Sequence, residues 1–207
     1  QSQNLFRYYG ASKSDWLHKV RDFEQTFAEY TGMQHALGVT SGTAALMTSL
    51  AAAGVGPGDE VIIPSYTWIA TATAVVWNMA VPVIAEVDET LTLDVEDVKR
   101  KITPRTRAIL PVHMRGAPCD MAAIMNIAEE NDVLVIEDTA QANGGTFQGR
   151  NLGTFGDINA FSLQYSKMIT TGEGGIVVTD SQPLYRRAQA YHDGGGIWRK
   201  NEEDLGD

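Results

Sequence analysis

The sequence is poor in cysteine: Cys119 is the only one among 207 residues. A single cysteine excludes an internal disulfide framework and any metal site built from several cysteines. Disulfide-rich secreted domains are therefore excluded as a class. The composition favours a reducing, cytoplasmic location.

Positive charge is also scarce. The 16 lysines and arginines stand against 26 aspartates and glutamates, which gives a net charge of -10 at pH 7, and no basic cluster offsets this surplus. A surface of this sign repels phosphate backbones and anionic lipid headgroups. We therefore predict neither a nucleic-acid partner nor a membrane partner.

Targeting and membrane-spanning patterns are missing as well. Residues 1–10 contain no apolar core of the kind that signal peptides need, so no signal peptide is expected. Residues 61–85 lack charge and are long enough to cross a bilayer. Their prolines, threonines and asparagine instead favour a strand, a loop, a helix and a second strand, all buried inside an α/β domain.

The remaining pattern is an alternation of strands and helices. Apolar residues spaced by three and four predict a first helix over residues 15–31, with Ser14 as its N-cap and Gly32 as its end. Strands are predicted at 36–39, 60–63, 81–87, 108–112, 133–137, 158–162 and 176–179, and further helices at 44–53, 69–77, 94–101, 121–130 and 183–191. This order predicts an α/β fold with a mostly parallel central sheet flanked by helices on both faces.

Three polar clusters fall directly after predicted strands, at residues 41–43, 138–141 and 162–167. In parallel sheets ligands bind beyond the carboxyl ends of the strands, so these clusters are the candidate site. The glycine-rich segment 54–58 is read as a turn instead, because it leads from a helix to a strand.

Each cluster taken alone has two interpretations. Ser41-Gly42-Thr43 at a helix N-terminus predicts either an anion site or simple helix capping. Asp138 after a buried strand is either a partner for a cationic group or a cap for the next turn. Lys167, between apolar and glycine-rich sequence, is either a reactive amine or a solvated surface residue.

Two further residues each have two interpretations. His113 falls at a predicted strand end, where it is either structural or a substrate-side group. Trp68 is either a core residue or the platform for a flat ring.

The clusters combine into four motifs in a fixed order. These are Ser41-Gly42-Thr43-Ala44-Ala45-Leu46, Pro64-Ser65-Tyr66-Thr67-Trp68, Glu137-Asp138-Thr139-Ala140-Gln141-Ala142, and Phe161-Ser162 to Lys167 followed by Gly172-Glu173-Gly174-Gly175. With them the chain resembles the pyridoxal-phosphate (PLP) sugar aminotransferases of the DegT/DnrJ/EryC1/StrS family, of fold type I. The likeness runs from Asp15 to about Tyr191.

The resemblance implies two catalytic residues. Lys167 would hold pyridoxal 5'-phosphate covalently and move the proton between substrate and cofactor. Asp138 would pair with the pyridinium nitrogen and keep it protonated, so that the ring acts as an electron sink.

The resemblance also implies the cofactor-binding residues. Gln141 would donate a hydrogen bond to the ring 3-oxygen, and Trp68 would stack on the ring face. Gly42, Thr43 and Ser162 would hold the phosphate through backbone amides and hydroxyls.

Substrate specificity follows less directly from the resemblance. Residues 112–118 resemble the family's loop near the substrate, and Gln164 stands where relatives carry histidine or glutamine. Lysine at position 167 favours transamination, because the sugar 3-dehydratases of the family carry histidine there.

Family members are considerably longer and have a small C-terminal domain. We therefore expect residues 1–207 to be the PLP-binding large domain without that domain, as a truncated product or half of a split enzyme. The expected partners are keto-sugar and amino-donor substrates, together with a second copy of the chain or a complementing C-terminal chain.

The predicted function is amino transfer from glutamate or glutamine to a keto-sugar or an aminocyclitol precursor, with PLP as cofactor and no metal. Two alternatives remain open. One is a PLP-binding fragment or non-catalytic subunit that needs a C-terminal partner, and the other is a PLP-dependent sugar dehydratase.

Overall fold

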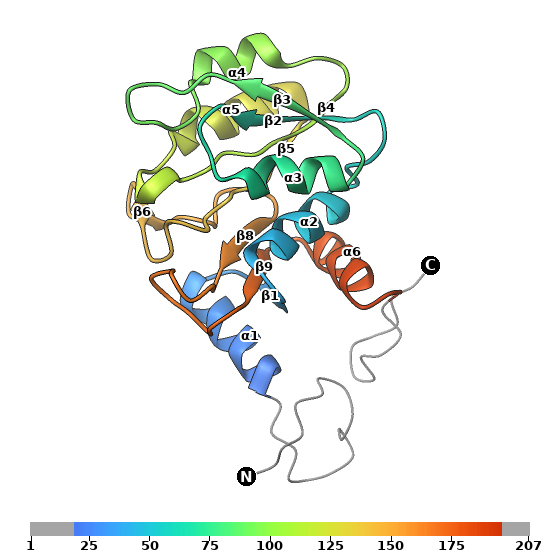
Figure 1. Cartoon of the computed structure of the whole chain (residues 1–207), viewed down its shortest axis with the longest axis vertical. Coiled ribbons are helices and arrows are strands. Elements are labelled where there is room, and N and C mark those ends of the chain that lie inside the picture. The colour runs from blue at the N-terminus through green and yellow to red at the C-terminus, as the bar shows by residue number, and fades with distance from the viewer. Residues whose placement is uncertain (1–18, 196–207) are drawn as a thin grey trace.

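The computed structural model describes residues 19–195 (Figure 1). The elements, in chain order, are α1 (Lys19–Thr31), β1 (His35–Val39), α2 (Gly42–Ala52), β2 (Glu60–Pro64), α3 (Ile69–Trp77), β3 (Val81–Ala85), α4 (Val95–Lys101), β4 (Thr106–Ile109), the 3-10 helix η1 (Met114–Gly116), α5 (Met121–Asn131), β5 (Leu134–Val135), β6 (Thr146–Phe147), β7 (Arg150–Asn151), β8 (Asn159–Ser162), β9 (Gly175–Thr179) and α6 (Gln182–His192). Within residues 19–195, no helix combines the length and the apolar character that a membrane crossing requires.

All the described strands except β6 and β7, which pair with each other, form one mixed sheet in two hydrogen-bonded halves. One half has the order β3-β2-β4-β5 with parallel pairing throughout, and the other has the order β1-β9-β8. A parallel bridge between Asp138, three residues beyond β5, and Ala160 of β8 connects the halves. Strand β9 runs antiparallel to both of its neighbours. The predicted mostly parallel sheet is confirmed, with β9 as the exception.

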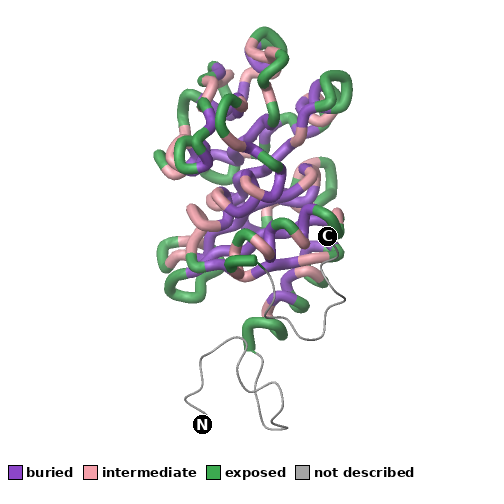
Figure 2. The backbone as a smooth tube through the Cα atoms, turned by 90° about the vertical axis from the view of Figure 1, so that its right-hand side faces the viewer, coloured by how far each residue is buried: buried purple, intermediate pink, exposed green. Residues whose placement is uncertain are grey.

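Helices cover both faces of this sheet, as Figure 1 shows. Alternate residues of one strand enter different cores: Val61 and Ile63 pack in the cluster that includes residues of α2, α3 and α6, whereas Ile62 packs in the cluster of α4 and α5. Helix α1 covers the β8-β9 end through Phe27 and Phe161. In Figure 2 the buried backbone accordingly runs through the middle of the molecule, and the exposed segments are mostly loops and helix ends.

Local signals set several of the boundaries correctly. Helix α3 has the predicted bounds, whereas α2 begins at Gly42, two residues before the predicted start, because the Ser41 side chain caps it by accepting the Ala44 amide at 3.0 Å. Asp94 caps α4, as predicted, by accepting the amides of its first turn. The short hairpin of β6 and β7 was not predicted, since strands of two residues leave almost no hydrophobic pattern.

Two burial predictions were wrong. Strand β3 is an edge strand rather than part of the sheet centre, with Val81 52% and Ile84 49% exposed, and Trp77 of α3 is 62% exposed. The absence of charge in a segment indicates apolar side chains, but it does not show whether other parts of the chain bury them. On α1, Phe27 is buried, whereas Val20 and Tyr30 of the predicted stripe are exposed.

The structure tests the predicted end of the first helix but not its predicted start. Its predicted end at Gly32 is confirmed, since Gly32 has a φ of +78° and its amide closes the last turn on Ala28. The predicted N-cap Ser14 and the first residue of the stripe, Trp16, lie outside the described residues.

Candidate active site

The end of β1 and the end of β8 meet at Gly42. A Cβ atom at Gly42 would lie 2.6 Å from Cβ of Ser162, so only glycine fits this position. The two strands approach because Gly175 of β9 pairs with Ser162 on one side and Val39 on the other. Two predicted clusters thus form one cradle at the N-terminus of α2, where backbone amides and the helix dipole favour an anion.

Asp138 lies at the joint between the two halves of the sheet and is 5% exposed. Its Oδ2 atom accepts a hydrogen bond from the Thr71 hydroxyl at 3.0 Å, and its Oδ1 atom accepts one from the Ala140 amide at 3.1 Å. Burial raises the pKa of Asp138, while these two hydrogen bonds and the nearby His113 and Lys167 act to lower it. A carboxylate held this way is suited to pairing with a cationic nitrogen.

Thr71 is a site residue that the sequence reasoning missed. It is fully buried on α3, and its hydroxyl also lies 2.8 Å from the Thr67 hydroxyl. Because Thr71 donates to Asp138, Thr67 is the donor in the second contact. The available signal was a pair of threonines four residues apart at the start of an otherwise apolar helix.

Lys167 lies in the turn that follows β8. Its backbone amide donates to the Gln164 carbonyl at 2.8 Å, and the Gln164 side chain accepts from the amide and hydroxyl of Ser166. The side chain is half-buried, and its amine has no hydrogen bond or ion pair within residues 19–195. The amine is therefore available to a ligand, and its charge acts on Asp138.

Gln141 and Trp68 present their functional groups in different ways. The Gln141 Oε1 atom accepts the Arg115 amide at 3.1 Å, which leaves Nε2, 3.4 Å from the Met114 sulfur, as the group that can donate to a ligand. Trp68 precedes α3 and is 68% exposed, so it is not a core residue. An exposed indole at this edge has a free face for a planar ring.

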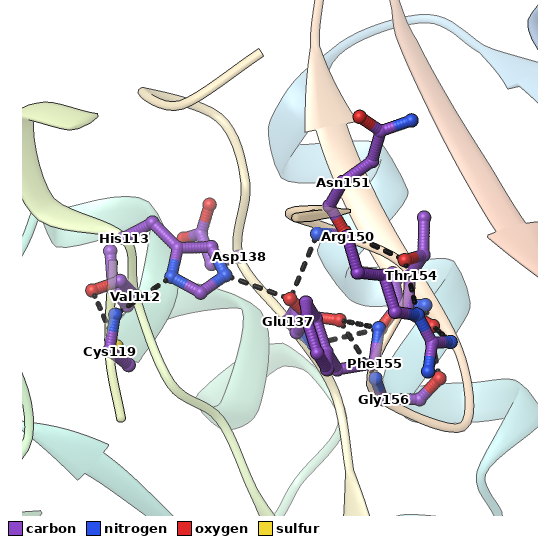
Figure 3. A network of polar contacts seen from close by, with 12 residues as sticks. Val112, His113, Cys119, Glu137, Asp138, Arg150, Asn151, Thr154, Phe155 and Gly156 are labelled. Atoms are coloured by element: carbon purple, nitrogen blue, oxygen red, sulfur yellow. Dashed lines mark hydrogen bonds and ion pairs between the residues drawn. The ribbon is translucent and has the colours of Figure 1, made fainter. Parts of the chain in front are cut away.

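His113 is not a substrate-side residue. Its side chain is 0% exposed, and Nε2 lies 2.8 Å from Oε2 of Glu137 (Figure 3). The other ring nitrogen, Nδ1, accepts the amide hydrogen of Cys119 at 3.2 Å. Both ring nitrogens are thus used inside the protein, so that the histidine is structural, as one of the two interpretations held.

The donor set is that of an organic cofactor site. Within the part of the chain that the structure describes, no group of three or more histidine, cysteine or acidic side chains could hold a metal ion. The cradle of Gly42 and Ser162, the buried Asp138 and the unpaired amine of Lys167 instead fit a ligand with a phosphate, a basic ring nitrogen and a carbonyl.

Comparison with known proteins agrees with this chemistry. The model of the DegT/DnrJ/EryC1/StrS aminotransferase family matches residues 7–205. The chain belongs to this family. The family membership confirms the resemblance drawn from the four motifs.

Two curated relatives show how much of a family member is present. The chain is 46% identical over 188 residues to the L-glutamine:2-deoxy-scyllo-inosose aminotransferase of Micromonospora echinospora, covering 90% of this chain and 45% of that protein. It is 47% identical over 166 residues to the GDP-perosamine synthase of Caulobacter vibrioides, covering 80% of this chain and 45% of that protein. The chain therefore spans about half the length of the curated relatives it matches.

Solved structures agree on the fold. S. venezuelae DesV, in complex with a ketimine intermediate, is 42% identical with a TM-score of 0.83, covering 89% of this chain and 50% of that one. A GDP-4-keto-6-deoxymannose-3-dehydratase with a trapped PLP-glutamate geminal diamine is 33% identical with a TM-score of 0.78, covering 83% of this chain and 46% of that one. The α/β architecture of fold type I is thus confirmed.

Proposed function

We propose that this chain is the PLP-binding part of an aminotransferase that moves an amino group from glutamate or glutamine to a keto-sugar or an aminocyclitol precursor. The observation that carries the proposal is the placement of Asp138. It is a buried carboxylate at the joint of the sheet, held by Thr71 and Ala140 and acted on by the charge of Lys167. This arrangement suits a protonated ring nitrogen beside a reactive amine.

When bound, PLP supplies the electron sink that an amino transfer requires. Asp138 would keep the proton on the ring nitrogen, and the amine of Lys167 would hold the cofactor and, once displaced by the amino donor, move the proton at the substrate carbon. Gln141 would donate from Nε2 to the ring 3-oxygen, and Trp68 would cover the ring face.

The phosphate end of the cofactor is held separately. Gly42 and Thr43 offer backbone amides at the N-terminus of α2, and Thr43 and Ser162 offer hydroxyls. The close packing of Gly42 on Ser162 fixes the distance between these two groups of donors. The cradle would hold the phosphate while Asp138 and Lys167 act on the ring.

The substrate class rests on the named relatives. One is named for 2-deoxy-scyllo-inosose and glutamine, and another for GDP-perosamine. From these names we infer that the amino acceptor is a cyclic keto compound and that the amino donor is glutamate or glutamine.

A sugar dehydratase is the second candidate, because a 3-dehydratase is among the similar solved structures. Lys167 favours transamination, since the resemblance places a histidine at this position in the dehydratases. Product analysis separates the two reactions: an amine gained supports the aminotransferase, and a hydroxyl lost supports the dehydratase. No turnover with a complementing C-terminal fragment present, but intact PLP binding, would support a non-catalytic subunit.

We also propose that residues 1–207 are the large domain, that the protein is cytoplasmic, and that a partner completes the site.

Large apolar side chains around Lys167 are exposed, with Tyr165 73% and Met168 79%. Such side chains are typical of surface covered by another chain or domain. We propose a homodimer or a complex with a C-terminal complementing chain. Sedimentation of the chain alone, and mixed with a C-terminal fragment of a relative, tests this, and a fully active monomer would contradict it.

A covalent adduct at Lys167 is the direct test of the proposed function. The protein is incubated with PLP, reduced with borohydride and digested, and the peptides are analysed by mass spectrometry. We expect phosphopyridoxyl on Lys167, and no specific label in Lys167→Ala. Lys101→Ala, which removes an amine on α4, is the control and should label like the wild type. Label spread evenly over several lysines would refute the proposal.

A further inference from the structure

The carboxylate of Glu137 is the most completely hydrogen-bonded buried charge next to the proposed site. It is 0% exposed. Its Oε2 atom accepts from His113 and from the Gly153 amide, and its Oε1 atom accepts from the amides of Phe155 and Gly156, at 2.5 to 2.8 Å. Figure 3 shows Glu137 between the imidazole on one side and the 155–156 loop on the other.

The four neighbours fix the charge state of Glu137. The three backbone amides can only donate, and His113 must donate from Nε2 because its Nδ1 atom accepts the Cys119 amide. A protonated carboxyl would direct its own hydrogen at a donor. Glu137 is therefore an anion held in a ring of N–H groups, one of which is the Nε2–H of His113.

The loop that donates these amides is closely packed at its glycines. A Cβ atom at Gly153 would lie 2.1 Å from the Phe161 ring, and one at Gly156 would lie 2.7 Å from the Val135 carbonyl oxygen. The amides are therefore packed against β5 and β8 through their own backbone. Glu137 thus connects this loop and His113, the residue before η1, to one point of the chain.

That point is directly before Asp138. Side chains alternate along a strand, so Glu137 and Asp138 lie on opposite faces. Asp138 is also fixed through its backbone, since its amide donates to the Pro111 carbonyl at 2.9 Å and its carbonyl accepts the His113 amide at 3.2 Å. Any rotation at Glu137 is transmitted to Asp138 through the one peptide bond between them.

We propose that Glu137 is a positioning residue, which, with His113, aligns the Asp138 carboxylate from the rear face of the sheet with the nitrogen of the cofactor ring. The inference rests on the proposed function, because it takes Asp138 as the partner of that nitrogen. Glu137 does not contact the cofactor, so its effect must appear in the nitrogen contact alone.

A pair of ligands isolates that contact. Dissociation constants are measured for PLP and for an analogue in which C–H replaces the ring nitrogen, and the preference for PLP over the analogue is their ratio. We expect Asp138→Asn to abolish the preference of the wild type. Glu137→Gln should reduce it about tenfold, as expected for the loss of alignment of one charged hydrogen bond.

Two more variants control for folding. Asp97→Asn removes another buried carboxylate, on α4, which accepts the backbone amide of Glu86. This variant should keep the full preference for PLP. If Glu137→Gln does not fold, His113→Phe tests the same point, because it removes one of four donors and keeps the ring volume. It should reduce the preference by a smaller factor.

The outcomes are distinct. The inference would be overturned if Glu137→Gln, or His113→Phe where the first variant does not fold, weakened the binding of PLP and of the analogue by the same factor. Glu137 would then have a purely structural role. If Asp138→Asn itself keeps the preference for PLP, the proposed role of Asp138 fails first, and the inference fails with it.

Discussion

The Thr71 hydroxyl lies 3.0 Å from Oδ2 of Asp138, in a buried contact between α3 and a residue three positions beyond β5. The segment that carries Thr71 also carries Trp68, so that one helix supplies a partner for the carboxylate and, in the proposed function, cover for the ring. The orientation of Asp138 therefore depends on a helix that is distant in sequence.

Thr71→Val should remove this hydrogen bond at nearly constant volume. The hydrogen bond favours the anion, so its loss raises the pKa of Asp138 further above its usual range. We expect PLP binding to decline at a higher pH than in the wild type as the pH falls, and stability to fall by about 1 kcal/mol. PLP titrations across pH, with urea unfolding, measure both.

Thr73→Val is the matched control on the same helix. Thr73 is half-buried and is not a hydrogen-bond partner of the Asp138 carboxylate, so its replacement should leave the pH profile unchanged. Identical profiles for both variants would show that the Thr71 contact does not act on the carboxylate.

Asp138→Asn should separate function from stability. Burial raises the pKa of Asp138, so the folded protein binds this proton more tightly than the unfolded chain does. Stability from such a group is present below the unfolded pKa and is lost as the pH rises. Without cofactor, Asp138→Asn should therefore be more stable than the wild type at pH 7, by roughly 1–3 kcal/mol, and similar at pH 3 to 4.

The same variant should transfer amino groups more slowly by orders of magnitude, because a neutral ring nitrogen is a poor electron sink. Thermal unfolding of the cofactor-free protein and single-turnover kinetics check the two halves. A variant that is less stable at pH 7 and still active would identify Asp138 as a structural residue.

Gly42→Ala should disrupt the phosphate cradle. The new Cβ atom would be 2.6 Å from Cβ of Ser162, so the end of β8 must move. We expect a loss of about 1–3 kcal/mol in stability. The affinity for PLP should fall more than the affinity for pyridoxal, which lacks the phosphate. Gly56→Ala, where nothing lies within 4 Å, is the control and should change neither quantity by more than about 0.5 kcal/mol.

The sequence predicted the parts of this site that follow from strand direction. Residues after parallel strands gather at one sheet edge, and Gly42 and Ser162 do meet there. It did not predict the network of Glu137 and His113, because hydrogen bonds to backbone amides 16 to 19 residues away leave no spacing pattern. Nor did it separate the buried β2 from the exposed edge strand β3, since both read as apolar runs.

A last prediction concerns the backbone of Arg115, which holds Gln141. Arg115 has a φ of +52°, in the left-handed region that costs a non-glycine residue about 1 kcal/mol or more. In this conformation its amide donates to Oε1 of Gln141 at 3.1 Å, which fixes the orientation of the side-chain amide. With Oε1 occupied, Nε2 is the group that can donate to the 3-oxygen of the cofactor.

Two replacements that both remove the guanidinium separate the backbone from the side chain. Arg115→Gly tolerates positive φ and should keep Gln141 in place, with equal or higher stability. Arg115→Val disfavours positive φ, so we expect the turn to open and Gln141 to rotate. The absorbance of bound PLP, titrated with pH, should then shift in Arg115→Val as it does in Gln141→Ala, and stay near the wild type in Arg115→Gly. If the glycine and valine variants shift together, the guanidinium rather than the backbone conformation acts on the cofactor, and the orientation assigned to Gln141 has no functional consequence.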